Sequence, residues 1–211
     1  MATAPRILIA DGDADTAQIA EFERGRRELL RRGFGLGGVA IAASSIPLLL
    51  AVHNAFAQAG DDGKILESAI NLERVAVIAY GTAIDSGLLS APLQRVARRF
   101  RDHEQEHADA LTSALTDLGG TPPEAPEGVN DVDAVVKGLR DVKSEADVAN
   151  FAIELETAAV AAYYDAHSRL IEAKLLQVGA SIMANEGQHL VVLRQAVDKD
   201  PVPNAFETGK S

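Results

Sequence analysis

The sequence has no cysteine and no tryptophan, and aromatic residues account for only 4% of its 211 residues. The absence of cysteine excludes disulfides, thiolate zinc sites, iron-sulfur clusters and thiol catalysis. A metal site in this chain must therefore be built from carboxylate and imidazole groups. The hydrophobic residues, 47% of the total, are mostly small or aliphatic, and this composition favours one all-α domain with some non-globular sequence.

Basic residues are outnumbered, with 20 Lys and Arg against 31 Asp and Glu and a formal net charge of -11. Residues 1–57 contribute nothing to this balance, because their six acidic side chains match six arginines. The acidic remainder argues against binding to nucleic acid or to anionic lipid. It is compatible with attracting cations to a carboxylate site, although a solvated acidic surface accounts for most of the charge.

A Glu-x-x-His pattern occurs twice, as Glu104 with His107 and as Glu186 with His189. Residues three apart on a helix leave the same face, so each pattern places a carboxylate and an imidazole side by side. One such pair is common by chance. Two pairs call for a search for partner residues.

Each pair is preceded by a second shared pattern, in which Leu-Glu is followed by tyrosine two helical turns after the glutamate. These residues are Glu73 with Tyr80, and Glu156 with Tyr163. The order of the two patterns is the same in both halves of the chain. The sequence therefore predicts an internal duplication of a two-helix unit.

Cap residues predict where the first two helices begin and end. Asp61 or Asp62 is expected to cap a helix that runs to about Ser86, and Ser90 is expected to cap a second helix over 91–118. In an antiparallel hairpin of these two helices, Glu73 and Glu104 are equally far from the turn, so they are expected to face each other at the same level along the bundle axis.

The second hairpin is expected to begin at Ser144, with a tight connection around Leu170 to Lys174, since an unbroken helix over 144–199 would be about 80 Å long. Between the hairpins lie the Gly- and Pro-rich segment 119–128 and a short helical piece, Val132 to Val142. This crossover of about 25 residues is far longer than a usual connection between adjacent bundle helices.

The N-terminal segment has the features of an export signal. Arg26-Arg27-Glu28-Leu29-Leu30-Arg31 precedes a mildly apolar run from Gly33 to Val52, and Ala55-Phe56-Ala57 follows. The arginine pair resembles the twin-arginine export motif, which implies the twin-arginine export machinery as a partner and a periplasmic or extracellular location. Cleavage is expected after Ala57, and the alternative is an uncleaved signal that anchors the chain in a membrane.

The expected domains are then the signal at 1–57, the bundle at 58–200 and a flexible tail at 201–211.

Two hairpins joined by a long crossover predict a four-helix bundle with carboxylates at its centre. Buried like charges repel unless protonation or a bound cation relieves them. Two divalent ions would balance four carboxylates, with one imidazole for each ion. The candidate metal ligands are Glu73, Glu104, His107, Glu156, Glu186 and His189.

This pattern resembles the ferritin-like superfamily of carboxylate-bridged dinuclear proteins, in which two helices each supply a Glu and two each supply Glu-x-x-His. With its export signal and its size, the chain is similar to the exported ferritin-like family related to desiccation-related proteins. The resemblance implies a ferritin-like four-helix bundle that holds two iron ions, or manganese in their place. It also implies bridging carboxylates at Glu104 and Glu186, terminal carboxylates at Glu73 and Glu156, and terminal imidazoles at His107 and His189.

Tyr80 and Tyr163 stand where ferritins and erythrins often hold a tyrosine near the metal site. They are the candidate catalytic residues, either through a hydrogen bond to a ligand carboxylate or as electron donors. The alternative is a core tyrosine anchored by one hydrogen bond.

Some family features are missing. The rubredoxin-like centre of rubrerythrins needs cysteine. Gln105 stands where bacterioferritin has its haem-ligating methionine, and Met183 is the only methionine after the signal. Nothing supplies the fifth helix of a ferritin cage, which argues against storage in a large shell.

The segment His103–His107 also fits the His-Glu-x-x-His pattern of zinc metalloproteases. A third ligand from a later helix is missing, because Glu124 and Glu127 lie in the Pro-rich loop, and the duplicate has Asn185 in place of the first histidine. His103 is therefore expected to be partly exposed or to lie beside the site. Other acidic and histidine residues are interpreted as incidental: His53, His167, Glu67, Glu106, Glu154 and Glu172.

Three function classes remain. The expected one is an oxidoreductase in which a di-iron or iron-manganese pair reacts with oxygen or peroxide and oxidises Fe(II) in stress defence. The others are a non-catalytic metal-binding or desiccation-protective protein, and a dimanganese catalase. Bundles of this type often pair through an exposed apolar helix face, so a homodimer is one expected assembly.

Overall fold

The computed structural model describes residues 61–130, 132 and 138–210. This part of the chain contains four long α-helices, a short 3-10 helix and no strand. The expected export signal lies outside these residues. None of the described helices has both the length and the apolar character that a membrane span requires.

The first hairpin consists of α3 (Asp62–Asp85) and α4 (Ala91–Asp117). The Asp61 side chain caps α3 by accepting a hydrogen bond from the Lys64 amide at 2.9 Å. Ser90 precedes α4, which has proline in its first turn, where no amide donor is needed. The helix ends predicted from the sequence are thus confirmed to within a residue.

The second hairpin consists of α6 (Glu145–His167) and α7 (Ala173–Ala196). Ser144 caps α6 by accepting a hydrogen bond from the Asp147 amide at 3.1 Å. The connection spans 168–172, about two residues earlier than predicted. It is closed by a contact from the other hairpin, in which the Asp62 carboxylate accepts hydrogen bonds from the amides of Ile171 and Glu172.

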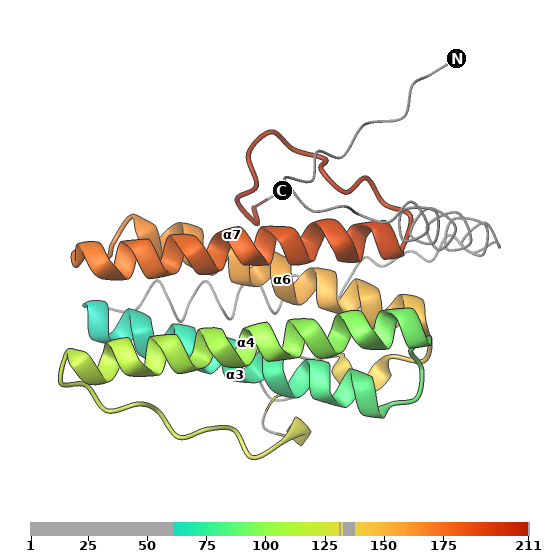
Figure 1. Cartoon of the computed structure of the whole chain (residues 1–211), viewed down its shortest axis with the longest axis horizontal. Helices are drawn as coiled ribbons and strands as arrows, with labels where there is room; N and C mark the ends of the chain where they lie inside the picture. The colour runs from blue at the N-terminus through green and yellow to red at the C-terminus, as the bar shows by residue number, and fades with distance from the viewer. Residues whose placement is uncertain (1–60, 131, 133–137, 211) are drawn as a thin grey trace, which may run out of the picture. The chain divides into compact units, whose positions relative to one another are not determined.

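The four helices form one bundle (Figure 1). Helix α3 packs along α4, and α6 along α7; the two hairpins meet where α3 contacts α6 and α4 contacts α7. Alanines fill much of the interface, and this lets the helices approach closely around larger aliphatic side chains. The predicted all-α architecture of two helical hairpins joined by a long crossover is confirmed.

The crossover over 118–144 is attached to the bundle. Val132 and Leu139 are buried in the core, and Arg74 on α3 donates a hydrogen bond to the carbonyl of Pro123. Of the expected short helix Val132 to Val142, the structure describes Val132 and the 3-10 helix η1 (Leu139–Asp141). The other residues of that prediction lie outside the described part.

The segment 201–210 was expected from the sequence to be a flexible tail, and its residues 207–210 lie against the second hairpin. Glu207 forms an ion pair with Arg194 at 2.8 Å, and Lys210 forms one with Asp165. Gly209 has a φ of +64 and approaches the backbone of α6 closely. The end of the described chain is therefore in contact with α6 and α7.

Candidate metal centre

Six ionisable side chains from four helices converge in the interior of the bundle. Helices α3 and α6 each contribute one glutamate, while α4 and α7 each contribute a glutamate and, one turn later, a histidine. The carboxylates of Glu73, Glu104, Glu156 and Glu186 are at most 1% exposed. The structure therefore brings together all six residues that the sequence singled out as metal ligands.

The six residues form two groups that share two members. One group is Glu73, Glu104, His107 and Glu186; the other is Glu104, Glu156, Glu186 and His189. Within each group, the potential ligand atoms lie within 4.8 Å of one another. Glu104 and Glu186 belong to both groups, so each of these carboxylates is placed to contact two adjacent ions.

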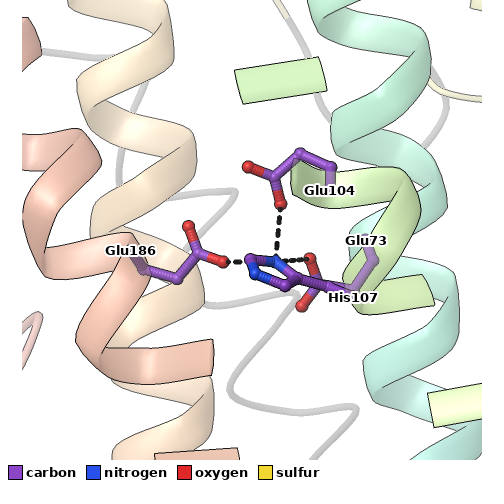
Figure 2. Close-up of side chains that lie close together, drawn as sticks. All are labelled: Glu73, Glu104, His107 and Glu186. Carbon is purple, nitrogen blue, oxygen red and sulfur yellow. Dashed lines mark ion pairs between the residues drawn. The ribbon is translucent and has the colours of Figure 1, made fainter. Parts of the chain in front are cut away.

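In the first group, the His107 ring nitrogen Nδ1 faces three carboxylates (Figure 2). It lies 3.0 Å from Glu186 Oε1 and 3.5 Å from both Glu73 Oε2 and Glu104 Oε2. One ring N–H can serve only one of these oxygens well. A cation between them would be shared by all four groups.

The second group repeats this arrangement. His189 Nδ1 lies 3.0 Å from Glu186 Oε2, 3.2 Å from Glu104 Oε1 and 3.4 Å from Glu156 Oε1. The two oxygens of Glu186 thus face different histidines, as do those of Glu104. This is the arrangement expected of carboxylates that bridge a metal pair.

Several of these buried atoms have no hydrogen-bond partner. A buried polar atom left unpaired costs about 1–3 kcal/mol, more if it is charged, and these atoms gather at one place. Carboxylate oxygens and imidazole nitrogens are good ligands for iron and manganese, so the donor set fits a pair of such ions. The unpaired atoms are Glu104 Oε1, His107 Nδ1, Glu186 Oε1, Glu186 Oε2 and His189 Nδ1.

The family comparison agrees with this geometry. A model of the family described as "Ferritin-like domain" matches residues 16–199. The chain belongs to the ferritin-like domain family. The match covers all four helices and all six candidate ligands, and it also extends over part of the expected export segment. No curated protein matches the chain.

Protonation balances the charges of the ferritin-like site when metal is absent. Burial raises the pKa of Glu73 and of Glu156 well above the usual range of a carboxyl group. Burial alone would lower the pKa of an imidazole, but the surrounding carboxylates outweigh it and raise the pKa of His107 and that of His189 to about 12. Burial would likewise raise the pKa of Glu186, yet the two histidines hold it at about 2.

The two tyrosines reach across the ferritin-like bundle. Tyr80 on α3 donates a hydrogen bond to Glu156 Oε1 on α6, and Tyr163 on α6 donates one to Glu73 Oε1 on α3. Each hydroxyl therefore holds a buried carboxylate of the other hairpin. Both tyrosines are buried, and the nearby carboxylates add to the effect of burial in raising their pKa values. They stay protonated and act as donors.

His103 lies beside the centre and belongs to neither ligand group. Its Nδ1 is 3.0 Å from His189 Nε2, and the rings of His103 and Phe100 both stack on that of His189. Burial and the neighbouring histidines lower the pKa of His103, which favours a neutral ring that accepts a hydrogen bond. The sequence placed His103 near the site but gave no sign of its partner, because the contact joins different hairpins.

The two halves of the centre differ in exposure. The side chain of His107 is 13% exposed, whereas that of His189 is 1% exposed. Of the residues interpreted as incidental, His53 lies outside the described part of the chain, and the others are absent from both ligand groups. His167 is the last residue of α6, where its ring nitrogens lie next to the carbonyl oxygens of Tyr163 and Leu176.

Proposed function

We propose that the chain binds two divalent metal ions, iron in the first place, and oxidises Fe(II) with oxygen or peroxide. The observation that carries the proposal is the pair of overlapping ligand groups with unpaired buried donor atoms at their centre. A zinc metalloprotease site would need His103 and His107 on one ion. His103 instead contacts His189 and joins neither group.

Each residue has a defined role in this proposal. Glu104 and Glu186 would bridge the two ions, while Glu73 with His107, and Glu156 with His189, would complete one ion each. Tyr80 and Tyr163 would hold the terminal carboxylates in place through the hydrogen bonds that they already donate. Each ion would thus have the same types of ligand, although the surroundings of the two halves of the site differ.

When bound, two Fe(II) would supply one electron each, enough to reduce one hydrogen peroxide, together with two protons, to two water molecules. The protein contributes the setting. Apolar side chains on both sides of the ligand layer exclude bulk water, and a dry site strengthens the attraction between carboxylates and cations. The more exposed His107 marks the side from which small reactants enter.

Manganese fits the same donor set, since both metals accept carboxylate and imidazole ligands. A dimanganese catalase and a metal-binding protein without turnover therefore remain alternatives. The proposed setting is outside the cytoplasm, in stress defence; support for export comes from the sequence features at residues 1–57 alone.

To test the proposal, Fe(II) is added to metal-depleted full-length protein in the absence of oxygen. Air is then admitted, and the oxidation of Fe(II) is followed by near-ultraviolet absorbance. The wild type is expected to bind two Fe(II) per chain and oxidise them faster than free Fe(II). Glu104→Ala and Glu186→Ala each remove a proposed bridging carboxylate. Both variants should lose most of their Fe(II) binding and Fe(II) oxidation, while circular dichroism shows that the helices persist. Glu106→Ala, on the exposed face of α4, should behave as wild type. Two bound metals in both bridge variants would refute the ligand assignment.

A further inference from the structure

A cluster of arginines marks the first half of α4. The cluster lies within seven positions of a chain that has 20 basic and 31 acidic residues, and it consists of Arg95, Arg98, Arg99 and Arg101. The first three are exposed, and we call them the arginine face. We propose that the arginine face binds an acidic electron-carrier protein, which delivers electrons beside His189. The inference rests on the proposed function, because it names the class of reductant for the same metal centre.

The stability of α4 does not account for the arginine face. Arg95 and Arg99 are one turn apart, and like charges at that spacing repel each other. Arg101 is held by Asp102 at 2.7 Å. The three arginines of the face form no ion pair within the described part of the chain, although acidic side chains are in excess. Their charges are therefore available to an anionic surface of another molecule.

The arginine face adjoins a side chain that touches the metal centre. His103 follows Arg99 by one helical turn and is partly exposed. Its Nδ1 lies 3.0 Å from Nε2 of the candidate ligand His189. Phe100 stacks on the same ligand, with ring centroids 3.9 Å apart. A carrier docked on the arginine face would thus stand beside His103, which is one hydrogen bond away from a candidate ligand.

The internal duplication shows that both features belong to one half of the molecule. The positions of α7 equivalent to the arginine face are exposed but uncharged, and they are Gln177, Ala180 and Ser181. Asn185 stands in place of His103. The arginines and the histidine thus occur together in one repeat and are absent together from the other. This joint occurrence points to a single use for both.

Charge and position together select the class of partner. A compact acidic protein can contact the arginine face alone, whereas nucleic acid or a membrane would also meet acidic parts of the chain, which repel polyanions. The adjacent metal centre gives a reason for a redox partner. Two reduced carriers would give up one electron each and return two bound Fe(III) to Fe(II). Docking between opposite charges speeds association and is weakened by salt.

The binding test uses a plant-type [2Fe–2S] ferredoxin as the acidic one-electron carrier, titrated by calorimetry into the metal-free full-length chain. Arg95→Gln with Arg99→Gln removes two charges from the arginine face. Lys64→Gln with Lys174→Gln removes two exposed charges at the other end of the bundle (Figure 1). The lysine variant should bind as wild type does, and the arginine variant about tenfold more weakly. Wild-type binding should weaken between about 50 mM and about 200 mM salt.

Three results of the binding test would overturn the proposal. The first is the absence of ferredoxin binding, or equal binding by the arginine and lysine variants. The second is equally strong binding of a redox-inactive protein of similar net charge, because the arginine face would then attract any anionic protein. The third is sedimentation with phosphatidylglycerol vesicles that is lost in the arginine variant, because anionic lipid would then be the occupant.

A second measurement follows the electrons. The Fe(III)-loaded chain is mixed with reduced ferredoxin without oxygen, and oxidation of the ferredoxin is followed by its visible absorbance. Wild type and the lysine variant should oxidise two ferredoxins per chain, and the arginine variant should do so about tenfold more slowly at low salt. Ferredoxin binding without reduction of bound Fe(III) would overturn the electron-carrier role.

Metal content and Fe(II) oxidation in air are measured on the same samples, so the two proposals can fail separately. Ferredoxin binding to a chain that takes up no metal would leave the docking surface standing while the metal function fails. Two bound metals with Fe(II) oxidation, but without ferredoxin binding, would do the reverse.

Discussion

The hydroxyls of Tyr80 and Tyr163 each hold a carboxylate that belongs to the opposite hairpin. The sequence placed each tyrosine two turns from a glutamate of its own helix, and that spacing suggested proximity to the site. It could not show that the hydrogen bond crosses the bundle, because helical periodicity gives the face of a residue and not the partner opposite. These two hydrogen bonds make the position of each of these carboxylates depend on the packing of both hairpins.

Tyr80→Phe tests this arrangement. Removing the hydroxyl leaves Glu156 without its donor, so we expect stability to fall by about 1–3 kcal/mol and metal affinity to fall by about 10–100-fold. Denaturant unfolding and an anaerobic Fe(II) titration measure the two effects. Tyr164→Phe, at a position that is 47% exposed, serves as the control. Unchanged affinity in Tyr80→Phe would show that the hydroxyl does not support the ligand.

His103 is expected to orient His189. When Nδ1 of His189 binds metal, its proton must sit on Nε2, from which it is donated to His103 Nδ1. His103→Asn, which copies Asn185 of the other repeat, should weaken the Glu156–His189 half by about 10–100-fold and leave the other half nearly intact. A Mn(II) titration would then show two separated steps. Equal weakening of both steps would contradict this role.

At the scale of single helices, the beginnings of α3, α4 and α6 were predicted because Asp61, Ser90 and Ser144 carry a local signal that the sequence displays. The connection between α6 and α7 was misplaced by about two residues because neither glycine nor proline marks it. Its amides bond to Asp62, more than a hundred residues earlier in the chain. Contacts of that range cannot be inferred from one sequence.

The attachment of the C-terminal segment depends on Gly209. A Cβ atom at this position would lie 2.3 Å from the Thr157 carbonyl oxygen, and the φ of +64 is itself unfavourable for other residues. Gly209→Ala should therefore detach the segment and break the ion pair between Lys210 and Asp165. Faster proteolysis of the C terminus, with metal content unchanged, is the expected result. Gly128→Ala, where a Cβ meets open space, is the control, and equal proteolysis of the two variants would contradict the attachment.

At the scale of the whole molecule, the bundle keeps four carboxylates in an alanine-rich interior. Burying charged groups is costly unless they are paired, so the fold needs counter-charges at its centre. The clustering of six candidate ligands in a mirrored pattern could be predicted from the sequence because the duplication repeats them. The differences between the two halves, such as the greater exposure of His107 and the contact between His103 and His189, depend on side-chain packing.

Metal uptake is expected to release protons. The raised pKa values of His107 and His189, about 12 without metal, mean that both imidazoles are protonated at neutral pH. A metal ion must displace these protons, and also those that the raised pKa values of Glu73 and Glu156 favour. Affinity should therefore increase from pH 6 to pH 8. Calorimetry in buffers of different ionisation enthalpy counts the protons released, and a pH-independent affinity with no release would contradict the proposed ligand set.

The central claim is that six residues from four helices hold two ions. The most direct measurement is the metal content of the full-length protein purified from its native compartment, by inductively coupled plasma mass spectrometry. The account predicts two iron ions per chain, and two manganese ions would retain the site while replacing the proposed reaction. One zinc ion per chain, or no metal and no uptake of added Fe(II) or Mn(II), would contradict it.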